Sequence, residues 1–325
     1  MSLERYDCCI NSCLAFTGPY KNAEICPICD ESRYSDDRKV RKVRNTFDYI
    51  PIVHRLRLQY ADPLRAALLK EYRRSLEEQP WEDGVRDYWD ALLYQQQKEG
   101  LFQDEHDIGL AFSTDGLSLF NVGQFSIWPL VLINLNLPPE LRVKKENILL
   151  CGIIPGPNSP KDIHSFLQPF IDELLQLEAG VPRVHDGSNE SLFTLHAYLC
   201  LCSGDLPAIA KMMGLSGHNS YDHCRFCQAP GIYAGHVYCP LKSPRGWQEH
   251  FQMDPNNLPH RTDTEYRMAA NRLNFQYNPI NNETEYGVRH ISSFFRLRSI
   301  NFPQSFPIDV MHLIFENVIR TLHKV

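Results

Sequence analysis

Two close pairs of cysteines near the start of the chain constrain its folding more than any other feature. The second pair is Cys26-Pro27-Ile28-Cys29, and Cys9 and Cys13 make the better first pair, with Cys8 as the spare. Two thiolates at each end of a loop suit one tetrahedral zinc ion, and a Cys-x-x-Cys spacing lets both sulfur atoms reach that ion. So short a segment buries too little surface to fold unaided, so the ion would be structural. We predict four Zn²⁺ ligands: Cys9, Cys13, Cys26 and Cys29. The alternative is a set of unconnected free thiols.

The cysteine count and the apolar pattern predict an intracellular protein. Eleven cysteines are an odd number, and the opening MSLERYDCC is too charged for a signal peptide. A reducing compartment favours metal ligands or free thiols over disulfides. The longest apolar runs are far shorter than the ~20 residues that span a bilayer, so we expect no membrane partner.

The net charge of -6 argues against a protein that coats nucleic acid through bulk charge. One local run is nevertheless basic, and it follows the cysteine pairs. Such a run is typical of phosphate contacts and of nuclear localisation signals, and the alternative is a solvated linker. We predict that its members contact nucleic-acid phosphates: Arg38, Lys39, Arg41, Lys42 and Arg44.

The apolar pattern predicts a layered core of strands and helices. Residues 46–100 have helix-like spacing of apolar side chains. Short apolar runs that end in turn formers predict four strands: 108–113, 125–134, 148–154 and 192–202. Apolar residues at helical spacing predict three further helices: 165–177, one that opens at 206–213, and 309–323. The first three strands are joined by short turns and should be antiparallel, whereas the fourth follows a crossover helix and could pair in parallel. The class is α/β or α+β.

A second Cys-x-x-Cys, at Cys224 and Cys227, predicts a second zinc site. His218 and His223 are close to it, but they could equally be loop residues. A distant residue, His312, is our candidate for the third ligand, and the fourth ligand stays open. A zinc ion that joined such distant segments would pin the polar stretch between them to the core.

Two aspartates, Asp115 and Asp205, each follow a predicted strand. Carboxylates at strand ends can converge although they are far apart in sequence, and two such groups could hold Mg²⁺ ions for phosphodiester chemistry. Each also has a structural alternative, since Asp-Gly is a common turn and Gly-Asp-Leu-Pro is a plausible helix cap. The chain has no Gly-x-Ser-x-Gly elbow and no glycine-rich phosphate loop, which argues against a serine hydrolase and an ATPase.

The order of its motifs resembles the transposases of CACTA (En/Spm-like) elements, especially the fungal ones. The colinear motifs are Cys9-x-Asn11-x-Cys13 with Cys26-Pro27-x-Cys29, Phe47-Asp48-Tyr49-Ile50-Pro51-Ile52, Ser113-Thr114-Asp115-Gly116, Trp128-Pro129-Leu130, Asn136-Leu137-Pro138-Pro139, Gly152-Ile153-Ile154-Pro155-Gly156-Pro157, Phe170-Ile171-Asp172-Glu173-Leu174, Gly204-Asp205-Leu206-Pro207-Ala208, Cys224-Arg225-Phe226-Cys227, and Ile308-Asp309-Val310-Met311-His312 with Glu316-Asn317-Val318.

The resemblance implies a ribonuclease-H-like mixed sheet with flanking helices and a metal-binding Asp-Asp-Glu triad. Asp115 and Asp205 match the first two acids, with Mg²⁺ or Mn²⁺ as the catalytic cofactor. For the third acid two alternatives stay open: Glu316, or an acid beyond Val325, and we expect the chain to be a fragment. The partners implied are transposon terminal repeats and target DNA in the nucleus. A homo-oligomer is expected because two DNA ends must be joined.

We expect three regions: a zinc-ribbon-like module with a basic tail at 1–45, a helical segment at 46–107, and the catalytic region at 108–325, with an insertion at about 228–300. The function expected is cut-and-paste DNA transposition. The alternative is a catalytically inactive remnant that acts only as a zinc-containing DNA- or protein-binding module.

Overall fold

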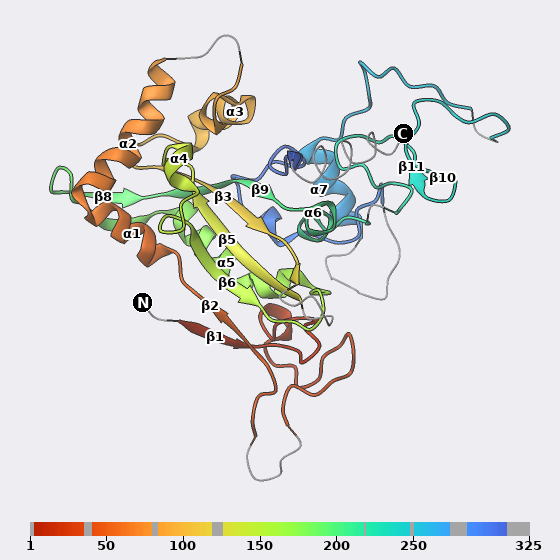
Figure 1. Cartoon of the computed structure of the whole chain (residues 1–325), viewed down its shortest axis with the longest axis horizontal. Coiled ribbons are helices and arrows are strands. Elements are labelled where there is room, and N and C mark those ends of the chain that lie inside the picture. Colours follow the sequence, from red (N-terminus) through yellow and green to blue (C-terminus); the bar gives the residue numbers. More distant parts are fainter. Residues whose placement is uncertain are drawn as a thin grey trace. The chain divides into compact units, whose positions relative to one another are not determined.

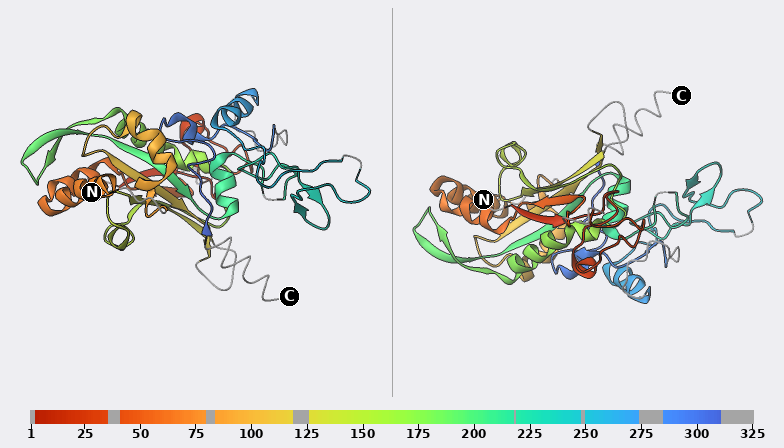
Figure 2. Two further views of the ribbon diagram at one scale, coloured as in Figure 1. Left: turned by 90° about the horizontal axis from the view of Figure 1, so that it is seen from above. Right: turned by 90° about the horizontal axis from the view of Figure 1, so that it is seen from below.

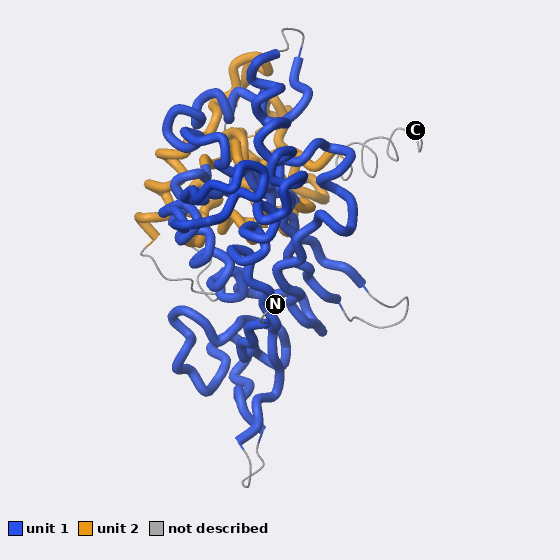
Figure 3. The backbone as a smooth tube through the Cα atoms, turned by 90° about the vertical axis from the view of Figure 1, so that its left-hand side faces the viewer, with its two compact units in different colours: residues 1–203, 296–300 blue, residues 204–295, 301–325 orange. Residues whose placement is uncertain are grey.

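The computed structural model of the chain describes residues 3–35, 41–79, 84–118, 126–217, 219–247, 250–273 and 285–310. The chain forms two compact units, residues 1–203 with 296–300 and residues 204–295 with 301–325 (Figure 3). The helices of the described residues are α1 (Val53–Ala61), α2 (Pro63–Glu78), α3 (Leu92–Leu101), α4 (Pro139–Arg142), α5 (Ile163–Ala179), α6 (Leu206–Met213) and α7 (Asp263–Arg272), with the 3-10 turns η1 (Gly18–Tyr20), η2 (Tyr88–Asp90) and η3 (Ser293–Arg296). None of these helices is long and apolar enough to cross a membrane.

The first unit is built on a mixed seven-stranded sheet (Figure 1). The strands of the described residues are β1 (Glu4–Asp7), β2 (Thr46–Tyr49), β3 (Ile108–Thr114), β4 (Leu117–Ser118), β5 (Ser126–Asn134), β6 (Leu149–Ile154), β7 (Val181–Asp186), β8 (Ser191–Leu195), β9 (Ala197–Ser203), β10 (Ile232–Tyr233) and β11 (Val237–Tyr238). The order in the sheet is β1-β2-β6-β5-β3-β9, with β4 paired to β5. The mixed α/β class is therefore confirmed.

The predicted pairing of the central strands is also confirmed. Strand β5 pairs antiparallel with both β3 and β6, and β9 pairs in parallel with β3 after the α5 crossover. The sequence pattern was wrong at two other places. Residues 192–202 are not one strand, because the strand is interrupted at His196 and only β9 joins the main sheet. Strand β8 pairs with β7 instead, and this hairpin lies beside α1 (Figure 2). Residues 46–49 open the stretch predicted as helical with a strand, β2.

Helix α5 begins and continues through three specific polar contacts. The Asp162 side chain caps it by accepting hydrogen bonds from the amides of His164 and Ser165, at 3.0 and 3.3 Å. Pro169 lies inside the helix and has no N–H to donate to the Ser165 carbonyl. The Thr17 hydroxyl donates to that carbonyl instead. The contact joins the N-terminal segment to the helix.

Strand β3 is buried on both of its faces. On one face Phe112 packs against Phe170 of α5, with ring centroids 4.9 Å apart. On the other face Gly109 lies under Trp89, where a Cβ would come 2.7 Å from the indole ring. An aromatic cluster around Trp89 covers this second face, and it includes Tyr88, Tyr94, Phe102 and Tyr198. The period of two along the strand thus places its neighbours in two layers.

The second unit is held by packing of aromatic rings around α7. Thr262 and Glu265 form a reciprocal capping box at the start of this helix. Tyr266 stacks on Phe302 at 5.0 Å, and Phe295 meets Phe302 edge-on at 4.5 Å. Within this unit, the regular elements of residues 219–247 are the two-residue strands β10 and β11.

Candidate functional site

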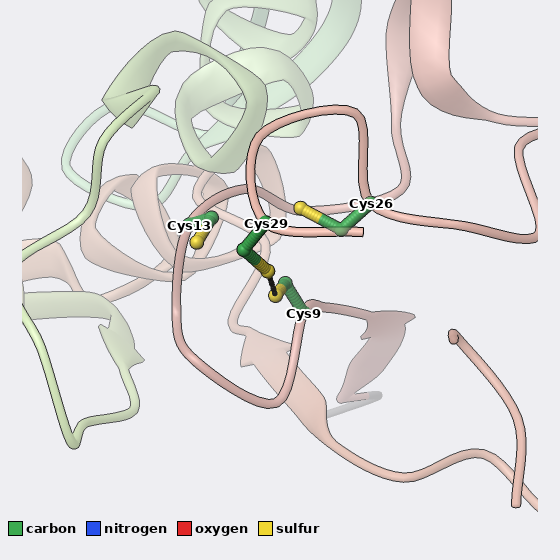
Figure 4. A group of neighbouring side chains, drawn as sticks. All are labelled: Cys9, Cys13, Cys26 and Cys29. Carbon is green, nitrogen blue, oxygen red and sulfur yellow. Dashed lines mark hydrogen bonds between the residues drawn. The ribbon is translucent and has the colours of Figure 1, made fainter. Parts of the chain in front are cut away.

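Four cysteines of the N-terminal segment converge on one point. The thiol sulfur atoms of Cys9, Cys13, Cys26 and Cys29 all lie within 4.8 Å of one another. Cys9 and Cys29 face each other with their sulfur atoms 3.4 Å apart (Figure 4). The first three cysteines are buried, and Cys29 is half-buried. Four sulfur donors in such a group fit a tetrahedral zinc ion, so the cluster could bind zinc, as the spacing predicts. Cys8, the spare cysteine, is buried outside this group.

Two tight loops bring the pairs together. The Ser12 amide donates to the Cys9 carbonyl at 2.9 Å, and the Asp30 amide donates to the Cys26 carbonyl at 2.9 Å. Ser12 and Asp30 both take the left-handed conformation, with φ of 61° and 59°, which short polar residues tolerate better than branched ones. The Asn11 amide points at the Cys9 sulfur at 3.4 Å. A hydrogen-bonded turn thus closes at each pair, over three residues at Cys9 and over four at Cys26.

The cluster is attached to the sheet and to α5, so it does not stand alone. The amides of Lys161 and Asp162 donate to the Cys13 carbonyl at 3.0 and 2.8 Å. The Ala15 amide donates to the Ser165 hydroxyl at 2.9 Å. Strand β1 leads into the cluster and pairs with β2, which pairs with β6. A structural ion here would therefore stabilise one end of the main sheet.

The thiols of the cluster share their protons unevenly. Hydrogen bonding from the Cys13 thiol and from nearby amides holds the pKa of Cys9 below its ordinary value. The same contact raises the pKa of Cys13. Burial raises the pKa of Cys26 to about 12. Metal binding at such a site requires thiolates and displaces the thiol protons.

The basic run is partly engaged within the N-terminal segment. Arg41 forms an ion pair with Glu24 and lies over the Tyr34 ring, 3.9 Å from its centroid. Arg44 pairs with Glu31 at 2.6 Å. Lys42 is exposed. Arg38 and Lys39 lie outside the described residues. Because two of these cations neutralise acids of the cysteine segment, the run's role in phosphate binding stays a prediction.

Asp115 follows the last residue of β3 directly. It is half-buried, and its carboxylate accepts a hydrogen bond from the Gly116 amide at 2.7 Å. The preceding Thr114 is 2% exposed, and among the described residues its hydroxyl has no hydrogen-bond partner. Trp128 packs over Gly116, 3.1 Å from where a Cβ would lie. The structural alternative for this residue, a turn at the Asp-Gly pair, is wrong: Thr114 pairs with Leu130 and Leu117 with Ile127, so the chain runs on along β5 in one register through Asp115 and Gly116.

Asp205 is the N-cap of α6. Its Oδ1 atom accepts a hydrogen bond from the Ala208 amide at 2.7 Å. The capping alternative for this residue is therefore confirmed. Capping uses one lone pair, whereas a carboxylate offers about four acceptor sites. The residue is half-buried and keeps capacity for a second ligand.

The register of β3 and β9 fixes the strands that precede the two aspartates. Ser113 of β3 is the partner of Ser203 of β9, and the strands run in parallel. Each aspartate lies two residues beyond its paired serine in the sequence. Asp115 belongs to the first unit and Asp205 to the second, so a shared site of the two carboxylates stays a prediction.

The second cysteine pair is also brought together, but with neighbours that the spacing did not predict. The sulfur atoms of Cys224 and Cys227 lie 3.3 Å apart. The Cys239 sulfur lies 3.6 Å from Nε2 of His223. The spacing leaves His223 open as a loop residue and does not indicate Cys239. A third cysteine soon after the pair, at 12 residues beyond Cys227, is the sequence signal that could point to it. His218, His312 and Glu316 lie outside the described residues.

Fold and sites together define a mixed α/β protein with a cysteine cluster that could bind zinc. The model of a family described as "Transposase family tnp2" matches residues 84–242. The match includes Asp115, Asp205 and the second cysteine pair, and the N-terminal cluster lies outside it. It supports a transposase family for this chain, and such a family implies DNA as the partner. No curated protein matches the sequence.

Proposed function

We propose that this chain is the catalytic region of a CACTA-type DNA transposase with a ribonuclease-H-like core. The family match over residues 84–242 carries the proposal, because that range holds both aspartates. The strand order supports it as well: three consecutive antiparallel strands, a crossover helix, and a fourth strand parallel to the first.

Asp115 and Asp205 are the proposed ligands of the catalytic divalent ions. Their donor set fits Mg²⁺ or Mn²⁺, which prefer oxygen ligands. When bound, such ions activate an attacking oxygen and stabilise the leaving oxygen of a phosphodiester. In this proposal Asp115 presents its carboxylate from the end of β3, and Asp205 presents one from the start of α6. Glu316 is the proposed third acid within this sequence, and an acid outside it is the alternative.

The N-terminal cluster is proposed to hold a structural zinc ion, and the exposed Lys42 to contact DNA phosphate. The proposed substrates are the terminal repeats of a transposon and a target DNA. Nuclear localisation and assembly into a homo-oligomer are part of the same proposal, since two DNA ends must be cut and joined together.

The test is nicking of supercoiled plasmid that carries the ends of the parent element, with Mn²⁺ or Mg²⁺. Asp115→Asn and Asp205→Asn should each abolish nicking, because asparagine keeps the shape but loses the charge. Asparagine is as good an N-cap as aspartate, so Asp205→Asn should leave α6 and the thermal stability unchanged. Asp205→Ala should lose about 1 kcal/mol as well as activity.

Asp254→Asn is the matched control, because Asp254 is an exposed loop residue whose side chain accepts from the Asn256 amide at 2.9 Å. It should nick as well as the unmodified chain. Nicking that survives in both Asp115→Asn and Asp205→Asn would rule out the assignment. Binding to the element ends without any nicking would favour a non-catalytic DNA-binding protein instead.

A further inference from the structure

The loop at Cys224 and Cys227 has the backbone geometry of a metal knuckle. The Cys227 amide points at the Cys224 sulfur at 3.4 Å, and the two sulfur atoms are 3.3 Å apart. An ion with Zn–S bonds of about 2.3 Å holds two sulfur atoms at roughly this spacing. The pair is thus poised to bind an ion from one side.

Buried arginines hold this loop in place. Arg225 is 8% exposed and donates to the carbonyls of Phe306 and Pro307, at 3.2 and 2.9 Å. Arg261 is 5% exposed and donates to the Cys227 carbonyl at 3.2 Å. Because both guanidinium groups bind backbone, they anchor the loop that carries Cys224 and Cys227.

A second pair of donors lies on the same segment. Nε2 of His223 and the Cys239 sulfur are 3.6 Å apart. Nδ1 of His223 lies 2.9 Å from the Ser220 carbonyl. A carbonyl only accepts, so Nδ1 carries the proton and Nε2 presents its lone pair toward Cys239. A backbone carbonyl on the far nitrogen is the usual arrangement of a metal-binding histidine.

The hairpin of β10 and β11 returns the chain to this point. Gly235 takes a φ of +80° at its turn, and the Gly231 amide donates to the Tyr221 carbonyl at 2.7 Å. A Cβ at Gly231 would come 2.4 Å from that carbonyl oxygen, so the approach needs glycine. The Cys239 sulfur lies 3.5 Å from the Ala229 carbonyl, two residues beyond Cys227. The hairpin therefore returns Cys239 to the loop that carries the cysteine pair.

The segment 219–247 has only a small apolar core of its own. The apolar side chains that it buries are Cys227, Ala229 and Ile232. Tyr221 and Tyr233 are about 60% exposed, at 59% and 60%. A stretch with so small a core usually needs a disulfide or a metal ion to fold stably.

We propose that His223, Cys224, Cys227 and Cys239 bind a second structural zinc ion as a Cys3His set. The four donor atoms stand as two close pairs, with 3.3 Å between the Cys224 and Cys227 sulfur atoms and 3.6 Å between Cys239 and His223. They do not form a single group such as the N-terminal cysteines do, whose sulfur atoms all lie within 4.8 Å of one another. Zinc binding draws the two pairs together around one tetrahedral ion. All four ligands belong to the second unit, so the site is complete without His312, the ligand that we predicted from the sequence.

The zinc content of the purified full chain tests the proposal, and it needs neither DNA nor nicking activity. Elemental analysis should find two zinc ions per chain. Cys239→Ser should retain one ion, Cys26→Ser should retain one, and the double variant should retain none. His236→Ala is the matched control, because His236 is an exposed histidine on the same hairpin. Both it and His312→Ala should retain two ions.

Cobalt substitution distinguishes a ligand from a residue that merely supports folding. His223→Cys converts the proposed Cys3His site to four thiolates. It should still bind one Co²⁺ there, with the d–d absorption shifted to longer wavelength. Two zinc ions in Cys239→Ser, a single ion in His312→Ala, or an unchanged cobalt spectrum in His223→Cys would each overturn the assignment. So would a Cys224–Cys227 disulfide in the freshly purified chain, seen by mass spectrometry as the loss of two hydrogens.

Discussion

Replacement of Asp87 by alanine should be among the most destabilising single changes in the first unit. The side chain of Asp87 is 2% exposed. Its carboxylate receives two hydrogen bonds from the Arg142 guanidinium, at 3.0 and 2.6 Å, and one from the Tyr72 hydroxyl at 2.6 Å. It also caps η2 by accepting from the Tyr88 amide at 2.6 Å. These contacts tie the aromatic cluster over β3 to the loop that follows β5.

The expected loss follows from what the substitution leaves behind. Arg142 is 11% exposed and would keep its contacts with the Leu137 and Leu135 carbonyls, but no counter-charge. Breaking a buried ion pair by removing one partner costs about 3–5 kcal/mol. The lost cap lies within the same substitution and adds ~1 kcal/mol at most. We expect a loss of about 4 kcal/mol, which is a large part of the 5–15 kcal/mol that stabilises a typical domain.

Urea denaturation followed by tryptophan fluorescence measures this loss, because Trp89 is buried beside Asp87. Asp48→Ala is the matched control. Asp48 and Arg5 also form a two-pronged pair, at 2.6 and 3.0 Å, but both side chains are largely exposed. An exposed pair contributes little, so the control should unfold at an unchanged midpoint. A loss below about 1 kcal/mol for Asp87→Ala, or equal losses for the two variants, would refute the argument that burial makes the difference.

Three further predictions follow from the first unit. Gly109→Ala should cost about 1–3 kcal/mol, because its methyl group would meet the buried Trp89 ring at 2.7 Å; an unchanged urea midpoint would contradict this. Burial opposes the charge of Asp186, but hydrogen bonds from Lys70 and other donors outweigh it and hold its pKa well below the usual range, so its stabilising contribution is complete at neutral pH and fades as the pH falls below about 4. The stability difference between the unmodified chain and Asp186→Asn should therefore narrow in acid; a constant difference from pH 7 to pH 3 would refute it. A chelator, or Cys26→Ser, should lower the melting temperature of the first unit, whereas Asp254→Asn should leave it unchanged.

Local pattern was sufficient to predict the centre of the sheet but not its edge. The runs at 108–113 and 148–154 are apolar and are followed by turn-forming residues. Their identity as strands can therefore be predicted from the local sequence alone. Strand β2 has four residues, and it exists because all four pair with β1 and two of them also pair with β6, both distant in the sequence. A four-residue strand has no periodicity of its own to distinguish it from the helix that follows. The break at His196 is of the same kind, since β8 is separated from β9 only by its pairing with β7.

The two cysteine sites differ in the same way: one could be predicted from local spacing and the other could not. The N-terminal ligands could be predicted because both pairs and their spacing are local. For the second pair, the sequence suggested the distant His312 as a ligand, whereas the structure brings His223 and Cys239 together through a hairpin turn. Two strands of two residues each leave almost no trace in the apolar pattern. A hairpin that returns a cysteine to a knuckle is visible only once the backbone has been traced.

The two aspartates differ in how firmly the fold fixes them, and this bears on where the chemistry could be lost. Asp115 extends a strand that is packed on both faces, by Phe170 on one side and by Trp89 on the other. Only Gly204 separates the last residue of β9 from Asp205, which is tied at once to α6 through its capping bond. The position of Asp205 therefore depends both on where β9 ends and on where α6 begins. A substitution elsewhere that shifts either element would displace the Asp205 carboxylate, and its effect would resemble the loss of this proposed catalytic acid.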